Sequence, residues 1–69
     1  MRKWFVLYLS DSSVRHSLIC NLTNLGLIEH WALLHVKPDE TRVVIVDTDT
    51  NYVREYRIED GMIIFVKFS

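Results

Sequence analysis

The sequence lacks the residues that usually supply small proteins with covalent or metal-based stabilisation. Cys20 is the only cysteine, so the chain can form no internal disulfide, and a lone thiol is typical of a reducing, cytoplasmic setting. This cysteine and the three histidines show neither C-x-x-C nor H-x-x-x-H spacing. We therefore expect no structural metal site and no cofactor.

Long hydrophobic runs and glycine motifs are also missing. The longest apolar runs, Trp4 to Leu9 and Met62 to Val66, are too short to cross a membrane, and the opening Met-Arg-Lys does not resemble a secretory signal. The two glycines, Gly26 and Gly61, frame neither a phosphate-binding loop nor a serine nucleophile. The sequence thus offers little support for an enzyme and argues against a membrane protein.

Apolar side chains, by contrast, are abundant. Hydrophobic residues make up 49% of the 69 residues, with two Trp, three Tyr and three Phe. A single domain spanning residues 1–69 has too much surface to bury all of these internally, and exposed apolar patches mark interfaces. We therefore predict a homodimer, with partner contacts made by aromatic side chains that the core does not absorb: Trp4, Trp31, Tyr52 and Tyr56. The competing interpretation of these four residues is core packing.

The charge is small but unevenly distributed. The net charge of −1 does not point to nucleic acid. Residues 1–38 hold four basic and two acidic side chains, a net of +2, whereas residues 39–60 hold three basic and seven acidic ones, a net of −4. We favour a role in solubility for the acidic part over a surface for a basic partner.

Several segments have the pattern of β-strands. Lys3 to Leu9 is apolar on both faces, which is typical of a central strand with a helix on one side and a partner or second layer on the other. Thr41 to Asp47 predicts a strand that returns after a turn at Lys37 to Glu40. The compact turn Glu59-Asp60-Gly61 predicts a hairpin that Met62 to Phe68 completes.

One segment has the pattern of a helix. Ser10 or Asp11 is a suitable N-cap, and the apolar residues that follow recur at spacings of four, four and three: Val14, Leu18, Leu22 and Leu25. Gly26 suits a left-handed C-terminal cap. We therefore predict a helix over about residues 11–25, followed by a strand from Leu27 to Val36 that pairs with the strand at Thr41 to Asp47.

These elements predict an α+β fold, a two-layer sandwich in which a mostly antiparallel sheet carries one helix on one face, in the order β-α-β-β-β-β. Residues 50–58 leave an alternative open. Their composition favours a strand, but Thr50 is also able to cap a short helix. In that case the order becomes βαββαβ, the ferredoxin-like arrangement.

Residues 6–36 contain a short set of motifs that resembles a known family. Val6-Leu7-Tyr8 ends the first strand, Asp11 lies in the polar turn, Arg15-His16 follows and Gly26 closes the predicted helix. This pattern is similar to the opening of the small ferredoxin-like CRISPR-associated endoribonucleases and related toxin-antitoxin proteins. The resemblance implies a dimer and a metal-ligating acidic residue after the strand-end tyrosine, a position that Leu9 occupies here. Arg15 stands at the first of the family's two basic positions, and His16 replaces the second.

Two functions are therefore open from the sequence. The leading hypothesis is a homodimeric, non-enzymatic protein-binding regulator or inhibitor of the kind that phages and mobile elements carry. The alternative is a ferredoxin-like, metal-dependent ribonuclease or RNA-binding protein, with Asp11, Arg15 and His16 at the mouth of the strand-helix turn.

Overall fold

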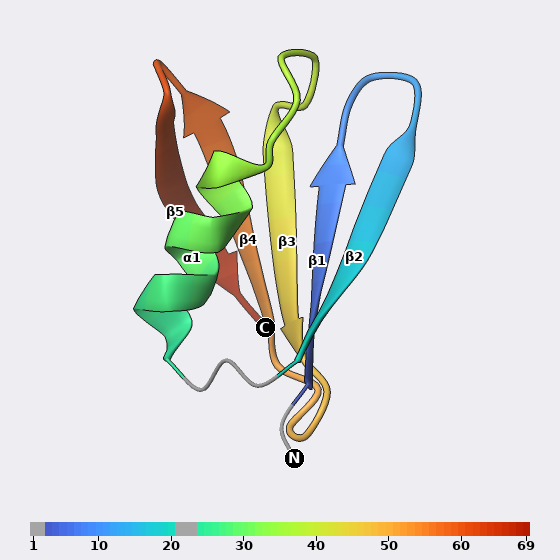
Figure 1. Ribbon diagram of the computed structural model, residues 1–69, viewed down its shortest axis with the longest axis vertical. Coiled ribbons are helices and arrows are strands. Elements are labelled where there is room, and N and C mark those ends of the chain that lie inside the picture. Colours follow the sequence, from blue (N-terminus) through green and yellow to red (C-terminus); the bar gives the residue numbers. More distant parts are fainter. Residues whose placement is uncertain (1–2, 21–23) are drawn as a thin grey trace.

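The described part of the chain, residues 3–20 and 24–69 of the computed structural model, contains a five-stranded antiparallel sheet and one helix. The strands lie side by side in the order β2-β1-β3-β4-β5 (Figure 1). Along the chain the elements are β1 (Lys3–Leu9), β2 (Val14–Cys20), α1 (Leu25–Leu34), β3 (Arg42–Asp47), β4 (Val53–Glu59) and β5 (Met62–Phe68). The prediction of an α+β protein with a mostly antiparallel sheet and one helix is confirmed. Along these described residues, no helix has the length and apolarity needed to cross a lipid bilayer.

The predicted helix over residues 11–25 is wrong, because Val14–Cys20 forms strand β2. The polar residues before it close a tight turn instead of capping a helix. The backbone N–H of Ser10 donates to the carbonyl of Ser13 over 3.0 Å, and the Ser10 hydroxyl accepts from the backbone N–H of Ser13 over 3.2 Å. The chain therefore folds straight back, and β2 pairs along its whole length with β1, from Leu9 opposite Val14 to Lys3 opposite Cys20.

The predicted strand from Leu27 to Val36 is also wrong, because the helix α1 occupies Leu25–Leu34. Asn24 is its N-cap, and the side-chain oxygen of Asn24 accepts from the backbone N–H groups of Gly26 and Leu27. Gly26 thus lies in the first turn of the helix and not at a C-terminal cap. The segment has the pattern of a buried strand because apolar residues lie on most sides of the helix, which hides the helical period.

These two corrections change the order of the elements and the pairing of the strands. The order is β-β-α-β-β-β, and Val53–Glu59 is a strand, which excludes the ferredoxin-like alternative that required a helix over residues 50–58. The predicted strand at Thr41 to Asp47 is confirmed as β3, but it pairs with β1 and β4 and not with the segment before it. The expected turn at Lys37 to Glu40 is present, closed by a 3.0 Å backbone bond from Glu40 N to the carbonyl of Lys37.

The hairpin formed by β4 and β5 is as predicted. Its loop consists of Asp60 and Gly61, both with positive φ, at 52° and 74°. Positive φ at both loop residues is the geometry of the tight hairpin turns that match the twist of the flanking strands. The sequence pair Asp-Gly therefore favours the turn of this hairpin locally.

The helix packs on one face of the sheet only, as Figure 1 shows with α1 in front of the strands. Ile28 and Ala32 of the helix are fully buried against a layer of sheet residues: Trp4, Val6, Tyr8, Ile19, Val43, Ile45 and Tyr56. Side chains on a strand alternate between faces, so the other side chains of β1 and β3 point away from the helix. No described helix or strand lies over that second face, and β1, which was expected to be buried on both faces, is buried on one.

Candidate functional site

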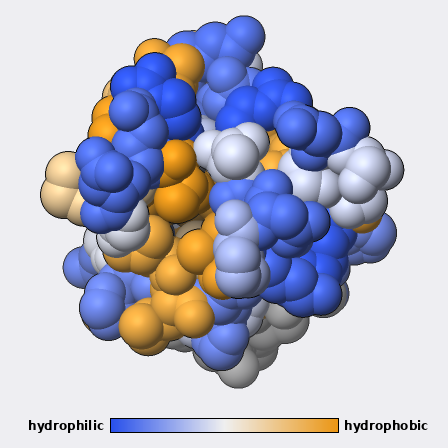
Figure 2. All heavy atoms as spheres, turned by 90° about the horizontal axis from the view of Figure 1, so that it is seen from above, coloured by the Kyte–Doolittle hydropathy of each residue, from blue (hydrophilic) through white to orange (hydrophobic). Residues whose placement is uncertain are grey.

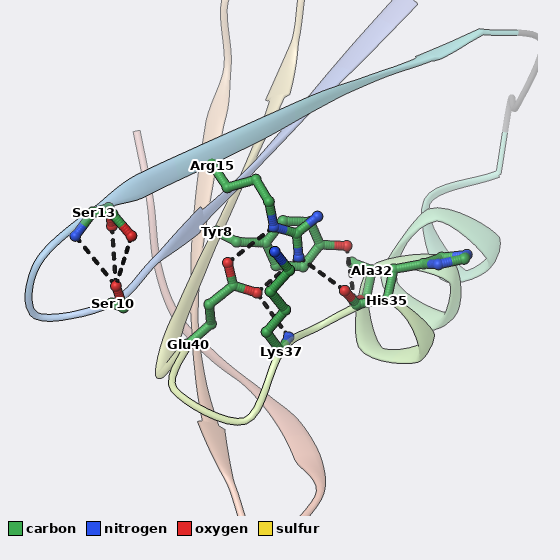
Figure 3. A network of polar contacts seen from close by, with 8 residues as sticks. All are labelled: Tyr8, Ser10, Ser13, Arg15, Ala32, His35, Lys37 and Glu40. Atoms are coloured by element: carbon green, nitrogen blue, oxygen red, sulfur yellow. Dashed lines mark hydrogen bonds and ion pairs between the residues drawn. The ribbon is translucent and has the colours of Figure 1, made fainter.

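An ion pair ties β2 to the loop between α1 and β3. Arg15 donates two hydrogen bonds to the Glu40 carboxylate, from Nε over 3.1 Å and from Nη2 over 2.8 Å (Figure 3). Arg15 Nη2 also donates to the carbonyl of His35 at the end of the helix, over 2.9 Å. The backbone N–H of Lys37 donates to the same carboxylate over 2.7 Å. The Glu40 side chain is thus buried, and both of its carboxylate oxygens accept hydrogen bonds. The ion pair holds the β1–β2 hairpin against the end of the helix.

The ring of Tyr8 packs against the guanidinium of this ion pair. The Arg15 guanidinium carbon lies 4.3 Å from the centre of the Tyr8 ring, and the Tyr8 hydroxyl donates to the carbonyl of Ala32 over 2.9 Å. Burial raises the pKa of Tyr8 to about 12, against the opposing effect of the Arg15 charge. The hydrogen bond from Arg15 lowers the pKa of Glu40, and the same bond raises the pKa of Arg15. Near neutral pH these groups exchange no proton, which suits a structural role and not acid-base catalysis.

The three residues of the alternative nuclease site are not brought together. Asp11 lies exposed in the turn between β1 and β2. Arg15 and His16 are successive residues of β2, so they point to opposite faces of the sheet. Arg15 is on the helix side with Glu40, whereas His16 lies opposite Leu7 on the other face. Within residues 3–20 and 24–69, no cluster of three or more His, Cys, Asp or Glu residues has the geometry to hold a metal ion.

The four aromatic residues predicted to contact a partner divide into two pairs. Trp4 and Tyr56 belong to the core, with 6% and 1% of their surface exposed. The Tyr56 hydroxyl donates to the Glu29 carboxylate of the helix, and burial, together with this bond, raises the pKa of Tyr56. Trp31 is half-buried on the helix, whereas Tyr52, at the start of the β4–β5 hairpin, is 55% exposed. Tyr52 and Trp31 are therefore the predicted contact residues that reach the surface.

Tyr52 belongs to a larger group that we call the aromatic row: Tyr52, Arg54, Phe65 and Phe68. The rings of Tyr52 and Phe68 lie 5.0 Å apart, and the Arg54 guanidinium carbon lies 4.8 Å from the centre of the Phe68 ring and 5.9 Å from that of Phe65. About half of the surface of each of the three aromatic residues is exposed. The sequence interpretation missed Phe65 and Phe68, although both lie in the apolar run that predicted β5.

The face of the sheet opposite the helix carries a contiguous apolar patch. Cross-strand pairs place Leu7 beside Val44, and Phe5 beside Val46, which in turn faces Val53. Phe5 is 38% exposed and its neighbours are partly exposed. We call this group the open-face patch, and it consists of Phe5, Leu7, Leu9, Val44, Val46 and Val53. It covers neighbouring positions on β1, β3 and β4.

Charged side chains border the open-face patch. On β3 and β4 the same face continues with Arg42 opposite Arg57 and with Glu55 opposite Val44. Arg57 forms an exposed ion pair with Glu59. An apolar centre with charges of both signs at its border is the usual anatomy of a protein-protein interface.

Apolar surface also appears at the end of the molecule that carries the β1–β2 and β4–β5 turns, the upper end in Figure 1. Seen from above, hydrophobic residues gather in a continuous area between the polar residues of the turns (Figure 2). Exposed apolar residues of this chain are found on the helix as well as on the sheet, among them Leu27, Leu34, Met62 and Val66.

Comparison with known proteins does not extend this description: no family model, curated protein or solved structure matches the chain. The candidate sites therefore stand on the geometry of the chain itself.

Proposed function

We propose that this protein is a homodimeric, non-enzymatic protein-binding regulator or inhibitor, and that a second copy of the chain covers the open-face patch. The single observation that carries the proposal is the sheet with a helix on one face and contiguous, partly exposed apolar side chains on the other. Contact between such a face and water is unfavourable, and burial against the equivalent face of a second copy removes this contact.

The size of the face suits a dimer. The whole open face, which includes the charged border of the open-face patch, consists of five strands spaced by about 4.8 Å with up to seven residues at about 3.3 Å each. It spans roughly 24 by 23 Å, or about 550 Å² per copy. Two such faces together bury about 1,100 Å², which is above the roughly 1,000 Å² that a specific interface requires. The open face of a second copy has the same twist, so two such faces match each other in shape when they pack face to face.

The charges at the border of the face favour a two-fold arrangement. The face carries basic residues, Arg42, Arg57 and Lys67, together with acidic residues, Glu55 and Glu59. Because both signs are present on each copy, a two-fold axis through the apolar centre allows opposite charges to meet across the interface. A face with one sign of charge would repel its own copy.

The role as a regulator or inhibitor follows from binding alone. A chain of 69 residues that acts through surfaces changes the activity of a partner by occupying part of the partner's surface. The dimer would present two copies of each remaining exposed apolar surface, which raises the apparent affinity for a partner with paired sites.

Sedimentation equilibrium of the purified protein and of its Phe5→Lys variant tests the proposal. Phe5 is the most exposed member of the open-face patch, so a lysine there is tolerated by the folded subunit but leaves a charge in the interface. We expect the dissociation constant of the dimer to rise at least about 100-fold, the effect of removing a central contact. The Leu34→Lys variant, which adds the same charge to an exposed site on the helix, is the matched control and keeps the dimer.

Leu7→Lys is a second variant of the same patch, and circular dichroism establishes that each variant is folded. The proposal is overturned if the unaltered protein is a monomer at high micromolar concentration, or if the folded Phe5→Lys and Leu7→Lys variants dimerise as tightly as Leu34→Lys. Cleavage of RNA in magnesium or manganese, lost in an Asp11→Ala variant, would replace it with the ribonuclease alternative.

A further inference from the structure

Strand β5 contains an irregularity that brings two phenylalanines to one face. Glu55 lies opposite Lys67 and Tyr56 lies opposite Phe65, so Val66 is an extra residue with no opposite partner on β4. Residues three apart on a regular strand point to opposite faces, but the extra residue restores Phe65 and Phe68 to the same side. Both rings accordingly lie near the Arg54 guanidinium, on the face that the helix covers elsewhere.

Arg54 is held by these rings, and within residues 3–20 and 24–69 it forms no ion pair with a carboxylate. The ion pairs among the described residues are Arg15 with Glu40 and Arg57 with Glu59. A guanidinium stacked on aromatic rings keeps its N–H groups in the plane of the group, where they are able to donate to an anion. The aromatic row thus combines a positioned cation with half-exposed apolar rings on each side of it.

The main chain beside this row is also open. Strand β5 is at the edge of the sheet, so no strand of the described part of the chain pairs with alternate N–H and C=O groups along Met62–Phe68. Of its seven residues only Lys67 is charged, although charges are a common means of protecting an edge from other strands. An extended peptide is therefore able to add to the sheet at this edge.

We propose that the β5 edge and the aromatic row bind an extended segment of a partner protein in which an acidic side chain lies between two apolar ones on the same face of the strand. The main chain of the segment pairs with β5, its apolar side chains pack beside Phe65 and Phe68, and its carboxylate accepts hydrogen bonds from Arg54. This inference rests on the proposed function, protein binding, and names the chemistry of the partner.

Charge complementarity selects this occupant. A carboxylate satisfies the one cation in the row, and apolar side chains cover the rings around it. A single-stranded nucleic acid also stacks on aromatic rings, but it requires a positively charged groove for its phosphates. The net charge of the chain is −1, and β4 itself carries Glu55 and Glu59. These charges oppose a phosphate backbone.

A labelled model peptide tests the inference by fluorescence anisotropy. The peptide has the order Thr-Phe-Thr-Glu-Thr-Phe. In an extended strand its two phenylalanines and its glutamate share one face, and its threonines share the other. Two further peptides replace the glutamate with glutamine or lysine. We expect the glutamate peptide to bind about fivefold to tenfold more tightly than the glutamine peptide, the effect of one exposed charge-assisted contact, and more tightly still than the lysine peptide.

The variants Arg54→Gln and Phe68→Ala locate the site. Arg54→Gln removes the preference for glutamate over glutamine, whereas Phe68→Ala weakens all three peptides. Leu34→Ala, which removes an exposed apolar side chain elsewhere, leaves binding unchanged. Perturbation of the β5 amide signals by the peptide, measured by NMR, identifies the edge directly.

The inference is overturned if the glutamate and lysine peptides bind equally, if none binds at millimolar concentration, or if a short oligouridine binds more tightly than the glutamate peptide. Its failure is distinct from failure of the dimer. The monomeric Phe5→Lys variant keeps the aromatic row, so peptide binding by that variant supports the inference whether or not the unaltered protein dimerises.

Discussion

Replacement of Arg15 by methionine tests whether the Arg15–Glu40 pair holds the helix end to the sheet. Methionine keeps the apolar stem of the side chain but removes the charge and every hydrogen bond of the guanidinium. The change removes two bonds to Glu40 and one to the carbonyl of His35. It leaves the Glu40 carboxylate, whose side chain is 5% exposed, with the backbone N–H of Lys37 as its remaining donor.

The expected loss of stability is about 2–3 kcal/mol. Removing one partner of a fully buried ion pair costs about 3–5 kcal/mol, and the expected cost here is at or just below the lower end of that range because the Arg15 side chain is 32% exposed and partly screened by water. A domain of 69 residues has a total stability of roughly 3–10 kcal/mol, so the change removes a large fraction of it. The melting temperature should fall by roughly 10–20 °C.

Thermal and urea unfolding, followed by circular dichroism, measure this loss. All samples are compared at one protein concentration, because dimerisation would couple stability to concentration. The matched control is Arg57→Met, which breaks an ion pair whose side chains are 55% and 48% exposed and which should cost no more than about 1 kcal/mol. The reasoning is refuted if Arg15→Met destabilises the protein no more than Arg57→Met does.

Three further predictions concern single features of the fold. The pKa of Glu40 is lowered in the folded state from its ordinary value of 4.5, so the stabilisation by the ion pair is complete above about pH 4.5 and is lost as the pH falls through the folded pKa. Urea unfolding across the acid range should show this loss in the unaltered protein and less of it in Arg15→Met. Gly61→Ala should cost about 1 kcal/mol in thermal unfolding, because φ is +74° while the space around a new Cβ is open; no change would contradict the assigned turn. Asn24→Ala should also cost about 1 kcal/mol by removing the N-cap of the helix, and Asn24→Ser should recover most of that loss.

The C-terminal half of the sheet was predictable because local rules determine it. The pair Asp60-Gly61 favours a tight hairpin loop, and the apolar and β-branched residues on both sides favour strands. The turn at Lys37 to Glu40 was likewise visible from the position of Pro38. The residues that give these signals are close together in the sequence, although the folded elements also contact distant parts of the chain.

The exchange of helix and strand within residues 11–36 was not predictable from the pattern used. Val14 and Leu18 fit a helical stripe with later leucines, and the helix α1 is apolar on most sides, so each segment imitates the other type. Pairing of β2 with β1 decides the outcome, and this pairing is a tertiary contact. Asn24 was the available signal for the helix start, because asparagine is a preferred N-cap.

The sequence predicted one of the candidate sites in part and did not predict the other two. Apolar residues on both faces of Lys3 to Leu9 indicated that one face would need a partner, and Phe5 and Leu7 do lie on the face without the helix. The aromatic row was missed because an extra residue in β5 is needed to place Phe65 and Phe68 together, and such a bulge has no sequence signature here. The Arg15–Glu40 pair joins residues 25 apart, so it follows only from the fold.

Isotope-filtered NMR on a mixture of labelled and unlabelled chains tests most directly whether a second copy covers the open face of the sheet. Contacts between methyl groups of Leu7, Val44 and Val46 in one subunit and the same group of residues in the other are the predicted result. A sample with no contacts between chains, or with contacts confined to the helix or to the β5 edge, would contradict the account.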